Sequence, residues 1–207
     1  MAWNNESNLL AVGASDNVLR LLRLDSATSS SNEDQAVSTG KTALSVSQTL
    51  NTHKGHVIQC AWNKKFKKLT SVDSSGLIIV WASQTNGSGS TAASWKEDMF
   101  NSRNGIQVTH LQWSRDGKKI CIAYVDGKYT YLQQTFEISS FSHLLLLGMV
   151  VMGEVDGNRL WGKALTKSGH FKKLAWSPDG QNILFATADG DLQLYDSEGN
   201  FLVSMQE

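Results

Sequence analysis

The chain has 207 residues, 41% of them hydrophobic, and its 19 basic and 19 acidic residues give a formal net charge of zero. A chain of this size can bury a sizeable core, and balanced charge gives it no overall field that would attract nucleic acid or a membrane. The start, Met1-Ala2-Trp3-Asn4, lacks the basic segment and apolar run of a secretory signal. Partner recognition must therefore depend on local surface patches.

Four tryptophans occupy the same place in a repeated pattern. Trp3, Trp62, Trp113 and Trp176 are each followed by a polar turn, an apolar run of strand length and a turn containing Gly, Asp or Asn. Apolar or alternating runs bounded by turn residues predict antiparallel strands. A repeat of about 40 to 45 residues with a Gly-His start and a Trp end is typical of WD-repeat β-propellers. The predicted fold is all-β, and each repeat is one blade.

Four blades follow in chain order. The predicted ranges are 1–24, 51–82, 95–163 and 168–207. Blade two carries the fullest pattern, and blade four repeats it with Asp189-Gly190 as its turn and Tyr195-Asp196 in place of Trp-Asp. Most WD-repeat rings have more blades than four, so we expect a piece of a larger ring that is truncated at both ends.

Consecutive tryptophans lie farther apart than one blade requires. Residues 26–47 and 84–94 explain the first two intervals, because they are too polar to bury a face and are predicted to be flexible loops. The third interval contains residues 128–148, directly after the turn Asp126-Gly127. Removing this segment brings the spacing of Trp113 and Trp176 into the range of a single blade.

Two interpretations of residues 128–148 stay open. Gly-Lys-Tyr at 127–129 can be encoded by a stretch containing GTAAGT, and Leu147-Gly148 by one containing TAG before a further G. A translated intron would fit these ends, and its excision would keep the reading frame and leave one glycine. The alternative is a genuine long loop, since long loops occur at functional sites.

Several residues are predicted to have structural roles. Gly55, His56, Ser71 and Trp81 match a hydrogen-bond set in which a His, a Ser or Thr, a Trp and a turn Asp join a blade's loop to its strands. Ser75 stands where that Asp is expected, and Asp73 lies two places earlier. Cys60 and Cys121 lie in apolar strand contexts and are predicted to be buried, reduced thiols. The full predicted blade signature is Gly55, His56, Trp62, Ser71, Trp81, Trp113, Trp176, Asp189 and Gly190.

We expect no metal, no cofactor and no catalysis. His53 and His56 are the only close histidine pair, and no Cys, Asp or Glu lies beside them at ligand spacing. The sequence has no nucleophile elbow, paired-carboxylate motif or Cys/His nucleophile context. Propeller active sites collect residues from separate blades, so an enzyme remains a third alternative, after the two functions given below.

Lys64, Lys65, Lys67 and Lys68 form the only dense basic run, with Phe66 between them. The simpler interpretation is a solvated turn with Phe66 packed against the sheet. The other is a contact patch for an acidic partner or for anionic lipid head groups, where each lysine contributes on the order of 1 kcal/mol.

Two segments point to one particular family among the WD-repeat propellers. Residues 69–81, Leu-Thr-Ser-Val-Asp-Ser-Ser-Gly-Leu-Ile-Ile-Val-Trp, and residues 155–163, Val-Asp-Gly-Asn-Arg-Leu-Trp-Gly-Lys, resemble the N-terminal propeller of the WD repeat-containing protein 35 family. Residues 118–122 and 196–201 are further matches. The resemblance covers nearly the whole chain except 26–47, 84–94 and 128–148. The WD-repeat part of the tubby-like protein 4 family is similar to the same propeller. The run Asn-Arg-Leu-Trp-Gly-Lys at residues 158–163 favours the WD repeat-containing protein 35 family over it.

This resemblance implies a non-enzymatic scaffold of intraflagellar transport complex A. The implied roles are retrograde ciliary transport, cilium assembly and delivery of membrane proteins to cilia. The implied partners are the other subunits of complex A and ciliary membrane-protein cargo, with no nucleic acid and no transmembrane segment. The implied locations are cytoplasm, cilium and ciliary base. The alternative, from tubby-like protein 4, is the substrate-receptor propeller of a ubiquitin ligase.

Overall fold

The computed structural model describes residues 1–25, 43–84, 94–103, 105–125, 148–165 and 171–205. The regular structure in these ranges consists of β-strands, which form four antiparallel sheets of four strands each. The chain divides into two units, residues 1–101 and 102–207, and each contains two sheets. The predicted all-β fold class is confirmed.

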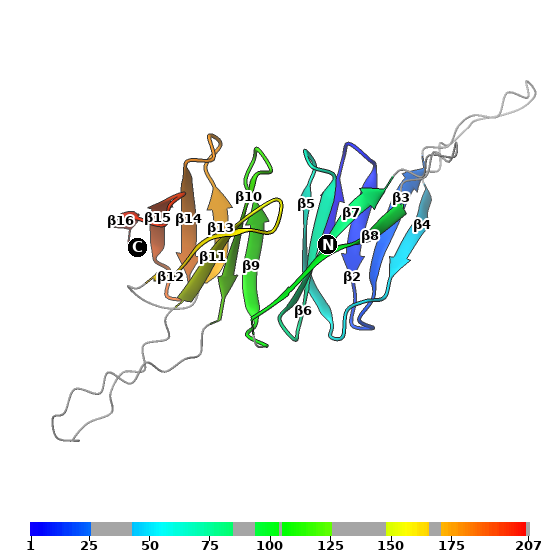
Figure 1. Ribbon diagram of the computed structural model, residues 1–207, viewed down its shortest axis with the longest axis horizontal. Coiled ribbons are helices and arrows are strands. Elements are labelled where there is room, and N and C mark those ends of the chain that lie inside the picture. Colours follow the sequence, from blue (N-terminus) through cyan, green and yellow to red (C-terminus); the bar gives the residue numbers. More distant parts are fainter. Residues whose placement is uncertain (26–42, 85–93, 104, 126–147, 166–170, 206–207) are drawn as a thin grey trace, which may run out of the picture. The chain divides into compact units, whose positions relative to one another are not determined.

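Unit 1 contains the first two sheets (Figure 1). Strands follow one another in chain order within each sheet. The first sheet consists of β1 (Ala2–Asn4), β2 (Leu9–Gly13), β3 (Leu19–Asp25) and β4 (Ala43–Leu50). The second consists of β5 (Val57–Asn63), β6 (Lys68–Asp73), β7 (Leu77–Gln84) and β8 (Ser94–Ser102).

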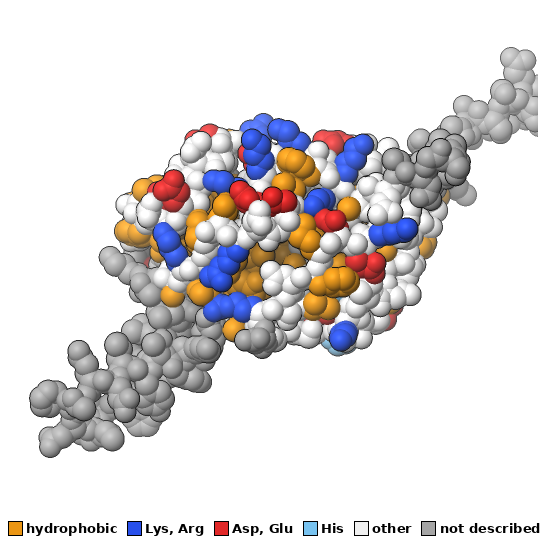
Figure 2. Space-filling model, viewed as in Figure 1, with side chains coloured by type: hydrophobic (Ala, Val, Ile, Leu, Met, Phe, Trp, Pro, Cys, Tyr) orange, Lys and Arg blue, Asp and Glu red, His pale blue; other side chains and the backbone are white. Residues whose placement is uncertain are grey.

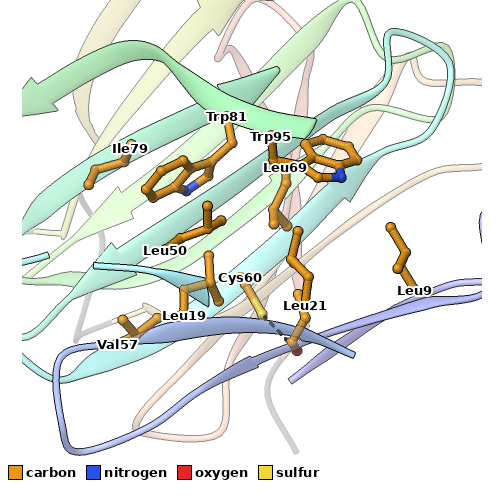
Figure 3. Packing of buried hydrophobic residues seen from close by; sticks show 11 residues of the cluster. Leu9, Leu19, Leu21, Leu50, Val57, Cys60, Leu69, Ile79, Trp81 and Trp95 are labelled. Atoms are coloured by element: carbon orange, nitrogen blue, oxygen red, sulfur yellow. Dashed lines mark hydrogen bonds between the residues drawn. The ribbon is translucent and has the colours of Figure 1, made fainter. Parts of the chain in front are cut away.

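The two sheets of unit 1 pack through their inner strands, with β5 lying against β1 and β2. Gly13 allows this approach, because a Cβ there would lie 2.5 Å from Cγ1 of Val57. The buried cluster draws on both sheets, and Figure 3 shows leucines of β3 and β4 together with Cys60, Leu69, Ile79 and Trp81. Inner strands therefore bury side chains against a neighbouring sheet, as blades do.

Unit 2 repeats this arrangement. Its first sheet consists of β9 (Val108–Trp113), β10 (Lys119–Tyr124), β11 (Gly148–Glu154) and β12 (Arg159–Leu165), and its second of β13 (Phe171–Trp176), β14 (Asn182–Thr187), β15 (Leu192–Asp196) and β16 (Phe201–Met205). β13 lies against β9 and β10. The core between the two sheets is rich in aromatic rings, with Phe171 4.7 Å from Phe185 and Phe185 5.6 Å from Tyr195 between ring centroids.

The predicted blade limits need two corrections. Residues 43–50 are β4, the fourth strand of the first sheet, so blade one does not end at residue 24 and the segment 26–47 is not all loop. Residues 94–102 are β8, the fourth strand of the second sheet, so they do not begin blade three. Both strands are largely exposed and polar, which hides the burial pattern that marks inner strands.

The remaining predicted loops and most of the insertion lie outside the described residues, at 26–42, 85–93 and 126–147. Gly148, predicted to end the insertion, is instead the first residue of β11. Cys60 and Cys121 are free and buried, as predicted. The Cys60 thiol donates a hydrogen bond to the carbonyl of Ala11 at 3.6 Å (Figure 3), and burial raises the pKa of both thiols.

Candidate functional site

A buried chain of hydrogen bonds joins His53, Ser71, Asp73 and Trp81 in the second sheet. Nε1 of Trp81 donates to Oγ of Ser71 at 2.8 Å, and Oγ of Ser71 lies 2.6 Å from Nε2 of His53. Nδ1 of His53 lies 3.0 Å from Oδ2 of Asp73. Because an ionised carboxylate can only accept, the proton of the neutral imidazole sits on Nδ1 and faces Asp73. Nε2 is then an acceptor, so the Ser71 hydroxyl donates to it while its oxygen accepts from the indole N–H.

Asp73 is the acceptor on which this network ends. Its Oδ2 accepts backbone N–H bonds from Lys54 and Gly55, both at 3.2 Å, and its Oδ1 accepts from Leu77 and from both N–H and hydroxyl of Ser75. Burial by itself would raise the pKa of Asp73, but the hydrogen bonds from Ser75, His53 and the backbone outweigh it and lower the pKa to about 2. Asp73 thus ties the segment before β5 to the turn between β6 and β7.

Stability is expected to fall with acidification in two steps. Burial lowers the pKa of His53 below its ordinary 6.5, so below that pH the unfolded chain binds a proton that the folded chain excludes. Asp73 contributes about 2 kcal/mol that is present above its ordinary pKa of 3.8 and lost as the pH falls toward 2. The urea midpoint should therefore drop from pH 7 to 5, and again below pH 4.

His110 is half-buried, and partial burial together with the charge of Lys173 lowers its pKa, so it titrates in the same upper window. A His53→Gln variant separates the two contributions, because it should flatten part of the decline between pH 7 and 5. A urea midpoint that rises on acidification over this range would contradict the assignment of His53 as neutral.

The network corrects one predicted site residue. The imidazole comes from His53 and not from His56, whose side chain is exposed. Only the backbone of His56 takes part, with its N–H donating to Oγ of Ser74 and its carbonyl accepting from the N–H of Ser74. Gly55 matters through its backbone N–H and its size, because a Cβ there would lie 2.6 Å from Oγ of Ser74. Ser71 and Trp81 are joined by the hydrogen bond from the indole to the hydroxyl.

Asp189 does not occupy the position of Asp73. Asp73 is the first of five residues that connect the second and third strands, whereas in blade four that position is Thr187, which is buried and accepts the N–H of Asp191. Asp189 is exposed, and Gly190 takes a left-handed φ of 94° that a glycine accommodates best. This pair shapes the turn.

The repeated tryptophans have a shared role within each unit. Nε1 of Trp62 donates to the carbonyl of Ala2 at 2.9 Å, and Nε1 of Trp176 donates to the carbonyl of Gln112 at 3.2 Å. In both cases the acceptor is the residue before the tryptophan of the preceding sheet, Trp3 or Trp113. Each bond joins the inner strands of adjacent sheets, so the recurrence of tryptophan marks an inter-sheet contact.

Two of the segments that carry the resemblance to the WD repeat-containing protein 35 family, residues 155–163 and 196–201, meet in unit 2. Nε1 of Trp161 in β12 donates to the carbonyl of Ser197, and Nζ of Lys163 donates to that of Glu198 at 2.8 Å. Gly199, with a φ of 78°, lies beneath the Trp161 ring, where a Cβ would be 2.9 Å from the ring. Residues 159–163 and 197–199 are thus two sides of one contact between the two sheets.

The basic turn, residues 64–68, connects β5 to β6. Lys64, Lys65, Phe66 and Lys67 are exposed, so the expectation that Phe66 packs against the sheet is wrong. Lys68 differs from the others because its side chain is largely buried and its ammonium pairs with Asp98 at 2.8 Å. Nζ of Lys64 donates to Oδ1 of Asn5.

Charges of both signs intermingle on the face of the molecule seen in Figure 2. The exposed part of the basic turn consists of Lys64, Lys65, Phe66 and Lys67, and we call these four residues the lysine–phenylalanine turn.

Within the described ranges, no group of three or more His, Cys, Asp or Glu side chains is arranged to hold a metal ion. Over the same ranges, no helix has the length and apolar character needed to span a bilayer. The polar chemistry of the described residues is instead concentrated in turns and in the buried network.

Comparison with known proteins decides the family. The family model for the WDR35/TULP4 N-terminal β-propeller matches residues 1–130, and human WD repeat-containing protein 35 is 37% identical over 209 residues, covering 100% of this chain and 15% of that protein. The chain belongs to the WDR35/TULP4 N-terminal β-propeller family. It is thus a WD-repeat scaffold of a family that is generally non-enzymatic. Its similarity to the relative covers only a small part of that protein's length.

Other relatives agree with this assignment, and one solved structure shares the fold. The rat WD repeat-containing protein 35 is 35% identical over 206 residues, again covering 100% of this chain and 15% of that protein. Human tubby-related protein 4 is 31% identical over 153 residues, covering 74% of this chain and 8% of that protein. A chain of the mitotic checkpoint complex has the same fold, with a TM-score of 0.62, 13% identity, and coverage of 99% of this chain and 49% of that one.

A second family model, for the WD40 domain of anaphase-promoting complex subunit 4, matches residues 147–206. Between the two matched ranges lie residues 131–146, inside the predicted insertion. The buried network of unit 1 and the Trp161 contact of unit 2 both lie outside this interval.

Proposed function

We propose that this chain is a protein-interaction scaffold of intraflagellar transport complex A, acting in retrograde ciliary transport, cilium assembly and the delivery of membrane proteins to cilia. The observation that supports this best is the similarity to WD repeat-containing protein 35 along the whole chain, at a higher identity than that to tubby-related protein 4. The proposed partners are other complex A subunits and membrane-protein cargo. The proposed locations are the cytoplasm, the cilium and its base.

The physical basis is the rigidity of the sheets. Buried hydrogen bonds and inter-sheet indole contacts fix the strands, and the turns at the strand ends are then held in defined positions where partners can reach them. No chemistry is required of the chain in this role. Affinity comes from exposed side chains on these turns.

The lysine–phenylalanine turn is the proposed contact site. It offers three exposed ammonium groups around one exposed aromatic ring, a combination that suits an acidic segment of a partner subunit. Lys68 is left out, because its charge is already neutralised by Asp98.

The first test of the role is recovery of partners. The endogenous protein is tagged in ciliated cells, purified and analysed by mass spectrometry. Complex A subunits should co-purify, and the tag should label the ciliary base. Recovery of ubiquitin-ligase subunits in place of complex A would overturn the transport role and support the substrate-receptor alternative.

Replacing Lys64, Lys65 and Lys67 with glutamine is expected to weaken partner binding by about tenfold or more at low salt, because three charges are lost from one turn. The difference should shrink as salt rises. Co-purification at two salt concentrations measures it.

The matched control replaces Lys96, Lys118 and Lys172 with glutamine. These lysines are also exposed, so the change in net charge is the same, but they lie on other parts of the chain. Equal weakening by the two triple variants would show an effect of net charge alone and would contradict the contact site. Unchanged binding by the first variant would contradict it as well.

A further inference from the structure

Three of the four sheets connect their second and third strands by the same short loop. In the first, second and fourth sheets the last paired residues before the loop are Gly13 with Leu19, Val72 with Ile78, and Ala186 with Leu192. Each loop therefore has the same length. The loops are 14–18, 73–77 and 187–191.

The fourth residue of each of these loops has a left-handed backbone. Its φ is 64° at Asn17, 79° at Gly76 and 94° at Gly190. Few residues other than Gly and Asn adopt this conformation without strain. The loop therefore needs both a fixed length and a permissive residue at its fourth position.

The third sheet has the equivalent strand pairing but a different loop. Ala123 pairs with Val150, as Ala186 pairs with Leu192, yet the whole of 124–149 separates the two partners. Tyr124 and Met149 form one further pair, at the positions where Thr187 donates its N–H to the carbonyl of Asp191 in the fourth sheet. Removal of residues 128–148 would leave Tyr124, Val125, Asp126, Gly127 and Met149, which is the loop length of the other three sheets. Gly127 would then fall at the fourth position, after an aspartate, as in Asp189-Gly190.

The residue before Met149 meets a second condition. Gly148 now holds this position, and a Cβ there would lie 2.5 Å from the ring of Phe171, which is fully buried. After the removal Gly127 would occupy the position, so the requirement for glycine would still be satisfied. A cut that took Gly127 and Gly148 together would leave no glycine at this place.

We propose that residues 128–148 are a removable insertion and that the protein also exists in a shorter, natively folded form in which the third sheet has the short loop. The two glycines at the borders of the segment fit this, because excision between their codons leaves a single Gly codon and keeps the frame. The inference is independent of the transport role, since it concerns how one sheet closes.

The transcript gives the first test. Amplification and sequencing of complementary DNA across the codons for residues 120–155 should yield a shorter product that lacks the codons for 128–148. A transcript population in which every copy retains these codons would overturn the excision. It would leave the transport proposal untouched, as recovery of complex A does not depend on it.

The protein gives the second test. The full chain and its variant lacking residues 128–148 are unfolded in urea and by heat. Closing the short loop in place of the long one should raise the ratio of folded to unfolded chain by about tenfold, because a shorter loop loses less entropy on closure. The shortened chain should also melt several degrees higher.

A third protein carries Gly127→Val in the shortened chain. It has the same loop length, but a β-branched residue at the left-handed position, so it should lose most or all of the gain. A shortened chain that is no more stable than the full chain would overturn the loop assignment. So would equal stability of the shortened chain with glycine and with valine.

Discussion

Replacing Asp73 with asparagine is expected to lower the free energy of unfolding of unit 1 by about 2 to 4 kcal/mol, because buried donors lose their charged acceptor. The Asp73 carboxylate accepts six hydrogen bonds, three on Oδ2 and three on Oδ1. An amide presents donors on one side, so whichever way it turns, buried N–H groups face N–H groups. Urea unfolding followed by circular dichroism measures the loss.

The matched control is Asp156→Asn. Asp156 also accepts hydrogen bonds within a turn, from Asn158, but it is exposed to water, so the cost should stay below about 1 kcal/mol. Ser71→Ala gives an independent check, because it breaks the chain of hydrogen bonds between Trp81 and His53 without touching the carboxylate. Equal losses for Asp73→Asn and Asp156→Asn would contradict the network as a source of stability.

Replacing Phe185 with alanine is expected to destabilise unit 2 by about 3 to 5 kcal/mol. Phe185 is fully buried, and its ring lies 4.7 Å from that of Phe171 and, in a T-shaped arrangement, 5.6 Å from that of Tyr195 between centroids. Removing it leaves a cavity between the two sheets that the flanking rings cannot fill without leaving their own rotamers. The shift of the urea midpoint at constant slope measures the effect.

Phe201→Ala is the control for this variant. Phe201 also contacts Tyr195, at 5.5 Å between ring centroids, but its side chain is 41% exposed on the outermost strand β16. Its removal should therefore cost much less. Similar losses for the two phenylalanines would contradict the position of the core between β13, β14 and the neighbouring sheet.

The inner strands of the sheets could be predicted from the sequence because their burial leaves a mark. β6 and β10 are nearly continuous buried runs, and the tryptophans of β5 and β13 recur because each reaches the preceding sheet. The fourth strands β4 and β8 could not be found in this way. Their side chains are mostly exposed to water, so a strand there has the composition of a loop.

The buried network was only partly predictable. Ser71 and Trp81 could be predicted from their positions in the strands. The Gly-His pattern, however, selects the histidine that follows Gly55, which is His56, whereas the network contains His53. The useful signal is distance from the strand, because the residue four places before Val57 reaches Ser71 and Asp73, whereas His56 is too close to the strand to fold back. Similarly, the pattern expects the turn aspartate directly before Gly76, a position held by Ser75, and so it misses Asp73.

The contact between Trp161 and Gly199 had no signal in the sequence at all. Both segments carry the family resemblance, yet nothing in either one indicates that they touch. Such pairings arise from the stacking of one sheet on the next, which depends on how all strands are joined.

The indole bonds from Trp62 and Trp176 point backward along the polypeptide, each from a later sheet to an earlier one. During synthesis on the ribosome, the accepting carbonyls of Ala2 and Gln112 are made before the tryptophans that donate to them. Until then, these carbonyls can accept this hydrogen bond only from water. Arrival of the next tryptophan excludes that water and locks the older sheet in place. Synthesis of each new sheet is therefore coupled to stabilisation of the sheet made just before it. Each sheet depends on its neighbour along the chain, as in other repeat proteins.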